Sequence, residues 1–215
     1  MRAAPALRAA PAFRATSWLG LFTLILGLVL GAPVARADTG DIGYEGASFA
    51  GSGEAPTADK PQSKLWFNDG LWWADLFDTA SGTWHIFRLD RTQQTWVDTG
   101  TLIDERPLTR GDTLWDGTHL YIATNVLAAS STENVAGQPA RLFRYSYDGG
   151  QKTFSLDTGF PVDVNNVSSE SLTLAKDGNG TLWVTWTQGK KVYVNSSEGD
   201  DASWGTPFAL NVTGA

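Results

Sequence analysis

The sequence predicts an all-β protein, a β-propeller made of four-stranded antiparallel blades with about three blades in the chain. Two observations lead to this prediction. From Ser63 onward, short aromatic and β-branched runs alternate with Asp, Asn and Gly turns, and no helical period is evident. An order of strand, turn, strand, loop, strand, turn, strand then recurs every roughly 50 to 60 residues, which is typical of propeller blades. A β-sandwich is the alternative fold.

The first 37 residues differ in composition from the rest of the chain. They contain four arginines and no acidic residue, and an apolar run extends from Trp18 to Leu30. Val34-Ala35-Arg36-Ala37 then offers small residues at the two positions that a signal peptidase reads. We therefore expect residues 1-37 to be a Sec-type signal peptide and the protein to be secreted, or extracellular. An uncleaved membrane anchor is the alternative, because the apolar stretch is nearly long enough to span a bilayer.

Composition narrows the classes of function. The chain has no cysteine, which excludes disulfides, thiolate catalysis and cysteine-bound zinc. It has two histidines, His85 and His119, so we expect no multi-histidine metal site, no metal and no cofactor. The net charge is −7 and becomes more negative when the arginine-bearing signal is removed. This charge argues against nucleic acid and anionic membrane as partners, and an exported chain without cysteine is typical of bacteria.

The remainder divides into a leading segment and three units. Residues 38-62 are rich in Gly, Ala, Ser and acids, which predicts a flexible segment with a possible edge strand at 44-49. The repeat predicts blades at residues 63-103, 109-162 and 168-212. Closed propellers typically have four to eight blades. We therefore expect an incomplete propeller, either a fragment whose remaining blades lie in cis or a truncated product. Assembly of three-blade chains in multiples is the alternative.

Each unit contains a hairpin with a tight turn and an aromatic residue shortly after it. Asn/Asp-Gly turns suit short hairpins because they accept positive φ. The strands after these turns align as Leu71-Trp72-Trp73, Leu120-Tyr121-Ile122 and Leu182-Trp183-Val184. Large flat side chains bury much area between neighbouring blades. This packing role is predicted for Trp72, Trp73, Trp96, Trp183 and Trp204.

The second turn of each unit resembles the Asp-box of sialidase-like propellers, which runs Ser-x-Asp-x-Gly, a short gap, then Thr-Trp. The nearest match is the segment 146–154, with one extra residue and Phe154 in place of Trp; segments 88–96 and 196–204 are more degenerate. The resemblance implies a secreted bacterial propeller in which Asp90, Asp148 and Glu198 tie turns and the following aromatic residue packs beneath. Sialidases of this type also use three arginines and a tyrosine–glutamate pair. The Phe/Tyr-Arg-Ile-Pro motif that usually carries the first arginine does not occur in this sequence.

We expect an extracellular binding or scaffold module for glycan or protein ligands. The alternative is a glycoside hydrolase or sialidase-like enzyme whose catalytic residues lie partly in other blades, and no catalytic residue is identified. In propellers the functional face includes the loops that join the fourth strand of one blade to the first strand of the next, here residues 102–112 and 160–171. The ligand-binding candidates are Arg110, Asp112, Asn166 and Glu170, with Trp66 and Trp115 as sugar-stacking platforms.

Overall fold

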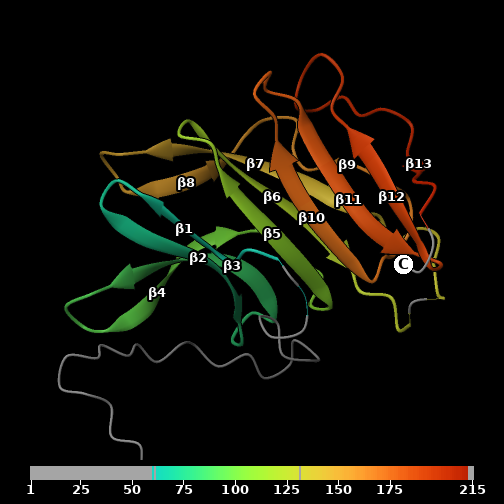
Figure 1. Cartoon of the computed structure of the whole chain (residues 1–215). Helices are drawn as coiled ribbons and strands as arrows, with labels where there is room; N and C mark the ends of the chain where they lie inside the picture. The colour runs from blue at the N-terminus through green and yellow to red at the C-terminus, as the bar shows by residue number, and fades with distance from the viewer. Residues whose placement is uncertain (1–59, 61, 131, 213–215) are drawn as a thin grey trace, which may run out of the picture. The chain divides into compact units, whose positions relative to one another are not determined.

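The computed structural model describes residues 60, 62–130 and 132–212, all within the unit Gly43–Ala215. In this part of the chain every regular element is a β-strand, and 13 strands form three antiparallel sheets (Figure 1). The all-β prediction is confirmed, and the described residues include no helix able to cross a bilayer. The expected signal peptide, 1-37, and edge strand, 44-49, lie outside the described residues, as does most of segment 38-62.

In each sheet successive strands pair, apart from one short extra strand in the second sheet, so the predicted repetition of antiparallel sheets is confirmed. Sheet 1 consists of β1 (Leu65–Asn68), β2 (Leu71–Asp78), β3 (Thr83–Asp90) and β4 (Thr95–Leu102). Sheet 2 consists of β5 (Thr109–Trp115), β6 (His119–Val126) and β7 (Arg141–Asp148), with β8 (Thr153–Leu156) and β9 (Val162–Asp163) both pairing with β7. Sheet 3 consists of β10 (Ser171–Lys176), β11 (Leu182–Gln188), β12 (Lys191–Ser196) and β13 (Phe208–Ala209). The described residues thus form three sheets, where a sandwich has two.

Local turn chemistry explains the hairpins. Asp69 and Gly70 form the two-residue turn between β1 and β2, and both have positive φ, 52° and 73°. Asp148 Oδ1 accepts the backbone N–H groups of Gly150 and Gln151 at 2.8 and 3.1 Å, as expected for the acid of an Asp-box-like turn. In sheet 3 this role falls to Asp200 rather than to the predicted Glu198, because Asp200 Oδ1 accepts two N–H groups.

Two hydrophobic clusters join the sheets. Alternate residues of β6 point to opposite sides, so Leu120 and Ile122 pack against sheet 1 whereas Tyr121 and Ala123 pack against sheet 3. Sheet 2 is therefore buried on both faces, which explains the nearly continuous apolar run in β6. In the first cluster, the residues from sheet 1 are Trp66, Trp73, Phe77, Trp84 and Ile86. In the second cluster, the residues from sheet 3 are Leu172, Leu174, Leu182, Val184 and Trp186.

Strand register assigns the tryptophans of β2 differently from the sequence alignment. Trp73 is fully buried and meets Phe154 edge-on with ring centres 5.0 Å apart, whereas Trp72 is 43% exposed. Side chains alternate between faces along a strand, so neighbouring residues cannot both fill one interface. The predicted packing role holds for Trp73 and is wrong for Trp72 within the described residues.

Candidate functional site

Arg110 belongs to a group of buried charged side chains around Trp84, between sheets 1 and 2. Its guanidinium carbon lies 5.8 Å from the centre of the Trp84 ring, and Lys64 Nζ lies 4.9 Å from it. Lys64 also donates a hydrogen bond to Asp75 Oδ2 at 3.1 Å. Burial raises the pKa of Asp75 despite the nearby Lys64. Arg110, which the sequence predicts to bind a ligand, is 1% exposed and lies in the protein interior.

Asp112 joins the three sheets. Its Oδ1 accepts the backbone N–H of Ser63 at 2.5 Å, and its Oδ2 accepts that of Leu174 at 2.7 Å. Ser63 precedes β1, Asp112 lies in β5, and Leu174 lies in β10, the first strands of sheets 1, 2 and 3. Burial raises the pKa of Asp112, and the two N–H groups act in the opposite direction. The carboxylate therefore holds the first strands of the sheets together.

The two tryptophans predicted as sugar platforms pack in the first cluster. Trp66 is 5% exposed, and its ring meets Phe154 edge-on at 5.7 Å. Trp115 is partly buried and packs edge-on against Tyr147 and Phe154, at 6.4 and 5.9 Å. Most of the Trp66 ring is therefore covered by protein rather than open to a ligand.

The last two candidates are more exposed than Arg110 and Asp112. Asn166 is exposed just after β9, and its backbone carbonyl accepts the N–H of Gly137 at 2.9 Å. Glu170 is partly buried, and its carboxylate lies 3.5 Å from Lys60 Nζ. Two grooves lie at the outer strands of sheets 1 and 2, and Asn166 is the one member of the six candidates that lines either of them.

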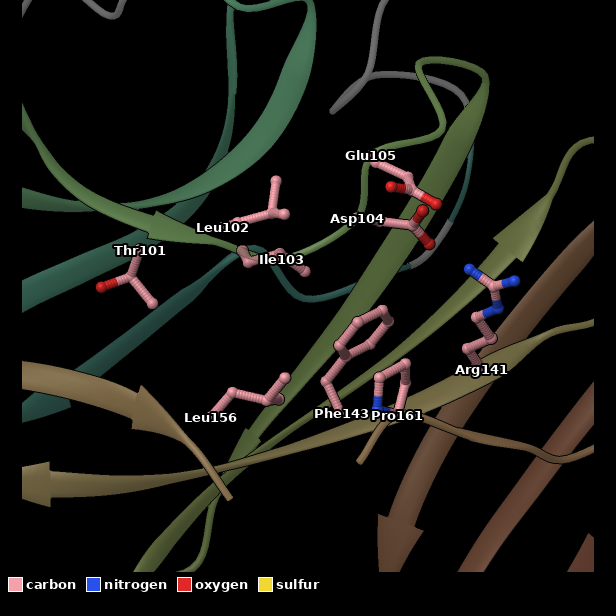
Figure 2. Close-up of a pocket in the computed structure, with 9 residues that line it drawn as sticks. All are labelled: Thr101, Leu102, Ile103, Asp104, Glu105, Arg141, Phe143, Leu156 and Pro161. Carbon is pink, nitrogen blue, oxygen red and sulfur yellow. The ribbon is translucent and has the colours of Figure 1, made fainter. Parts of the chain in front are cut away.

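Two cavities follow the outer strands of sheets 1 and 2. The first, which we call the apolar groove, has a volume of about 340 Å³ and is shown in Figure 2. The second, which we call the asparagine groove, has a volume of about 320 Å³. Both sizes are within the range of small-molecule sites. The apolar groove is lined by Thr101, Leu102, Ile103, Asp104, Glu105, Arg141, Phe143, Leu156 and Pro161. The asparagine groove is lined by Asp163, Val164, Asn165, Asn166, Asn195, Trp204, Gly205 and Pro207.

The same local structure leads into both grooves. Ile103 and Val164 are each 2% exposed, and each donates its N–H to a backbone carbonyl of the neighbouring strand, that of Trp84 at 2.7 Å and that of Ala140 at 2.9 Å. The buried apolar residue anchors the chain as it leaves the sheet. The next residue is therefore placed at equivalent points of the two sheets.

That next residue is Asp104 in sheet 1 and Asn165 in sheet 2. In both cases the side-chain Oδ1 accepts the N–H of the residue two positions later, at 3.0 Å from Arg106 and 3.3 Å from Val167. This is the usual way in which Asp and Asn hold a turn. The repeat therefore places a polar side chain in the wall of each groove, with a carboxylate in one and an amide in the other.

The apolar groove has a charged end. Arg106 Nη2 donates to Asp104 Oδ2 at 2.6 Å, and Thr124 Oγ1 donates to the same oxygen at 2.7 Å. Burial acts to raise the pKa of Asp104, but these hydrogen bonds and the charge of Arg106 outweigh it, and the pKa is lowered. Figure 2 shows the Arg141 guanidinium directed toward Asp104 and Glu105, with apolar side chains around the rest of the groove. The side-chain carboxylate of Asp104, which accepts these hydrogen bonds, is thus ionised at neutral pH.

The asparagine groove is held open by Asn195 of β12. Asn195 is 2% exposed, and its Nδ2 donates to the carbonyls of Val164 at 3.0 Å and Gly205 at 2.9 Å. At Gly205 a Cβ would lie 2.7 Å from Glu198 Oε1, so a side chain does not fit without movement. This close approach places the neighbouring, half-buried Trp204 in the wall of the groove.

Asn165, in the lining of this groove, has a donor that is not used. Its Oδ1 accepts the N–H groups of Ala140 at 2.7 Å and Val167 at 3.3 Å. Its Nδ2 is buried and has no hydrogen-bond partner among the residues that the structure describes. A buried donor without a partner costs about 1–3 kcal/mol, and such a group calls for an explanation such as a bound water or ligand. The groove thus combines an indole, an unused amide donor and the exposed amide of Asn166.

Sequence reasoning found part of this groove. The repeat predicts a functional loop at residues 160–171 and indicates Asn166 and Glu170 within it, but not Asn165. Trp204 was assigned to packing alone, and Asn195 was not selected. Asn is depleted in strands, so its presence after the apolar residues 192–194 was an available signal of a side-chain role.

No protein-family model matches the chain, and no curated protein matches it by sequence.

Proposed function

We propose that this chain is an exported, carbohydrate-binding module built from blades of a β-propeller, and that its ligand occupies the asparagine groove. Two features support the propeller. Each pair of consecutive sheets is joined face to face by one hydrophobic cluster, and Asp112 links residues at the first strands of all three. Export is supported by the composition of residues 1-37, which resembles a cleaved signal.

The unused Nδ2 donor of Asn165 beside Trp204 is the observation that carries the proposed ligand class. A sugar presents hydroxyl oxygens that accept N–H groups and C–H faces that pack on an indole. Ligand sites generally combine such an apolar surface with a few placed polar groups. A sugar hydroxyl on Asn165 Nδ2 would remove the cost of the unpaired donor, so that binding and local stability would be coupled.

The chemistry of the asparagine groove favours a glycan over a protein ligand. A protein segment with aliphatic side chains fits the apolar groove better, because Leu102, Leu156 and Pro161 line it. The asparagine groove instead presents three amide side chains and one indole. A neutral glycan also meets no electrostatic barrier at a chain with a net charge of −7.

Binding is also better supported than glycoside hydrolysis. Hydrolysis generally needs two carboxyl groups about 5–9.5 Å apart, one of them with a raised pKa. Asp163 is the one carboxyl in the described lining of the asparagine groove. Asp75 and Asp112 have raised pKa values, but both are buried and bonded to Lys64 or to backbone N–H groups.

A glycan array followed by titration calorimetry tests the proposal. The informative variant is Asn165→Asp, because it keeps the acceptor for Ala140 and Val167 and removes the Nδ2 donor. The matched control is Asn179→Asp, which makes the same change at an exposed turn. We expect the sugar identified on the array to bind Asn165→Asp at least about tenfold more weakly, and Asn179→Asp as tightly as the unaltered protein.

Two results would overturn the proposal. One is the absence of any glycan ligand on the array for the folded full chain, and the other is unchanged affinity of Asn165→Asp. Turnover of chromogenic glycosides by the same preparation would instead favour the enzymatic alternative.

A further inference from the structure

A second cluster of polar side chains lies on sheet 1, outside the asparagine groove. Asp78 ends β2, His85 lies in β3, and Asp98 lies in β4. One donor atom from each residue lies within 4.8 Å of the donor atoms of the other two. The side chain of His85 is 13% exposed and that of Asp98 is 33% exposed, so the cluster lies at the surface, with His85 more covered than Asp98.

A β-bulge brings Asp98 to His85. Asp98 opposes Phe87 and Thr101 opposes Ile86, so residues 99 and 100 are extra in β4. The bulge is fixed because Thr99 Oγ1 donates to the Ile86 carbonyl at 2.6 Å. Bulges bend a strand and re-aim its side chains, and they are common next to functional sites.

The His85 ring is held from both sides. Its Nδ1 lies 2.8 Å from Asp98 Oδ2, and its Nε2 lies 3.0 Å from Thr83 Oγ1. Asp78 is oriented by the N–H groups of Ala80 at 3.2 Å and Ser81 at 2.8 Å. All three potential ligands are therefore positioned before any ion arrives, which reduces the entropy lost on binding.

The charge of the cluster is not balanced by basic side chains. Among the described residues, neither Asp78 nor Asp98 forms an ion pair with Lys or Arg. Two other carboxylates of this sheet are paired, Asp69 with Lys152 and Asp75 with Lys64. Two unbalanced carboxylates beside an imidazole favour the binding of a dication.

We propose that Asp78, His85 and Asp98 bind a divalent transition-metal ion such as Zn²⁺. The ion takes the place of the proton between His85 Nδ1 and Asp98 Oδ2, which lie 2.8 Å apart. Two ligands about 2.0–2.2 Å from a tetrahedral ion lie roughly 3.4 Å apart, so Asp98 moves back slightly from His85 when the ion binds. The neutral ring then carries its proton on Nε2 and donates it to Thr83 Oγ1. Metal-bound histidines usually make such a second hydrogen bond.

A metal ion at this site departs from the expectation of no metal that the sequence suggests. The small number of histidines excludes a multi-histidine site, but one imidazole and two carboxylates need only one histidine. Mixed nitrogen and oxygen ligands suit Zn²⁺ and Mn²⁺, and three protein ligands leave room for water. His85 also opposes Leu102 in the sheet, so the site adjoins a residue that lines the apolar groove.

Titration calorimetry of the full chain with ZnCl₂ at pH 7, after removal of bound metal with a chelator, tests the proposal. We expect one ion per chain at this site, with binding at least about tenfold weaker in His85→Asn and in Asp98→Asn. The matched control is His119→Asn, which removes the other histidine and should leave Zn²⁺ affinity unchanged. Thr83→Val should weaken binding by roughly 10- to 100-fold through loss of the second-shell bond.

A direct spectroscopic readout covers the case in which a variant fails to fold. In the unaltered protein, Zn²⁺ should move the ¹⁵N signals of the His85 ring and leave those of His119 in place. The proposal is contradicted if His85→Asn retains full affinity, if His119→Asn alone loses it, or if millimolar Zn²⁺ leaves the His85 signals unmoved.

Discussion

Asp112 accepts a hydrogen bond from the backbone N–H of Leu174 at 2.7 Å, which links sheet 2 directly to sheet 3. The other carboxylate oxygen accepts the N–H of Ser63 at 2.5 Å, just before sheet 1. Both grooves are walled by residues of neighbouring sheets, so the spacing of the sheets sets their shape. Asp112 is thereby a structural residue on which the geometry of the proposed ligand site depends.

Replacement of Asp112 by alanine should destabilise the protein by about 2–4 kcal/mol, because the buried N–H of Leu174 and the partly buried N–H of Ser63 lose a charged acceptor. Urea denaturation followed by tryptophan fluorescence measures the change. Asp163→Ala is the control, since the Asp163 side chain is 62% exposed, and it should change stability by less than about 0.5 kcal/mol. Equal effects of the two substitutions would contradict the linking role.

Gly111 is expected to tolerate no side chain. A Cβ at this position would lie 2.4 Å from Asp75 Oδ2 and 3.1 Å from Ile122 Cγ2, and Asp75 is itself held by Lys64. Gly111→Ala should therefore lower the free energy of unfolding by about 1–3 kcal/mol. The comparison is Gly178→Ala, where nothing lies within 4 Å of the added Cβ. A stable Gly111→Ala protein would show that Asp75 is free to move.

The two tryptophans of β2 should respond differently to truncation. Trp73→Ala removes a fully buried ring and should cost about 3–5 kcal/mol. Trp72 is 43% exposed, so Trp72→Ala should cost less than about 1 kcal/mol. Thermal unfolding of both variants measures the difference, and a larger loss for Trp72→Ala would mean that the register of β2 is shifted by one residue.

Asp104 should contribute a pH-dependent part of the stability. Its pKa in the folded protein is lowered, so its contribution is present above the unfolded pKa of about 3.9 and is lost as the pH falls through the folded value. The difference in unfolding free energy between the unaltered protein and Asp104→Asn should therefore be constant from pH 7 to 5 and shrink below pH 4. Denaturation curves at pH 7, 5 and 3 measure it; a difference that grows toward low pH would contradict the lowered pKa.

Local patterns made much of the fold predictable. Strands with alternating apolar residues and Asp/Asn-Gly turns are determined by residues that lie close together in the sequence. The strands and their repetition are therefore predictable from sequence. The face that Trp72 or Trp73 presents depends on strand register, which the wider packing sets. Charged residues are ordinarily exposed, so the sequence does not indicate that Arg110 and Asp112 are buried. The N–H groups that bond Asp112 come from distant segments.

The site was predictable in part for the same reason. Segment 160–171 was identified from its place in the repeat, which is a local property. The selection of Asn165 needs two facts that only tertiary structure supplies, namely that its Oδ1 is used within sheet 2 and that its Nδ2 is left without a partner among the described residues. Trp204 likewise serves both the second cluster and the groove wall, and sequence alone suggested the first role.

The most direct test of the proposed function is chemical-shift mapping of the ¹⁵N-labelled protein with the sugar identified on the array. The side-chain amide of Asn165 and the indole N–H of Trp204 should shift in proportion to the bound fraction. The indole of Trp183, 37% exposed outside the groove, should not move. Shifts confined to Leu102 and Leu156, or to Trp72, with Asn165 unmoved, would contradict binding in the asparagine groove.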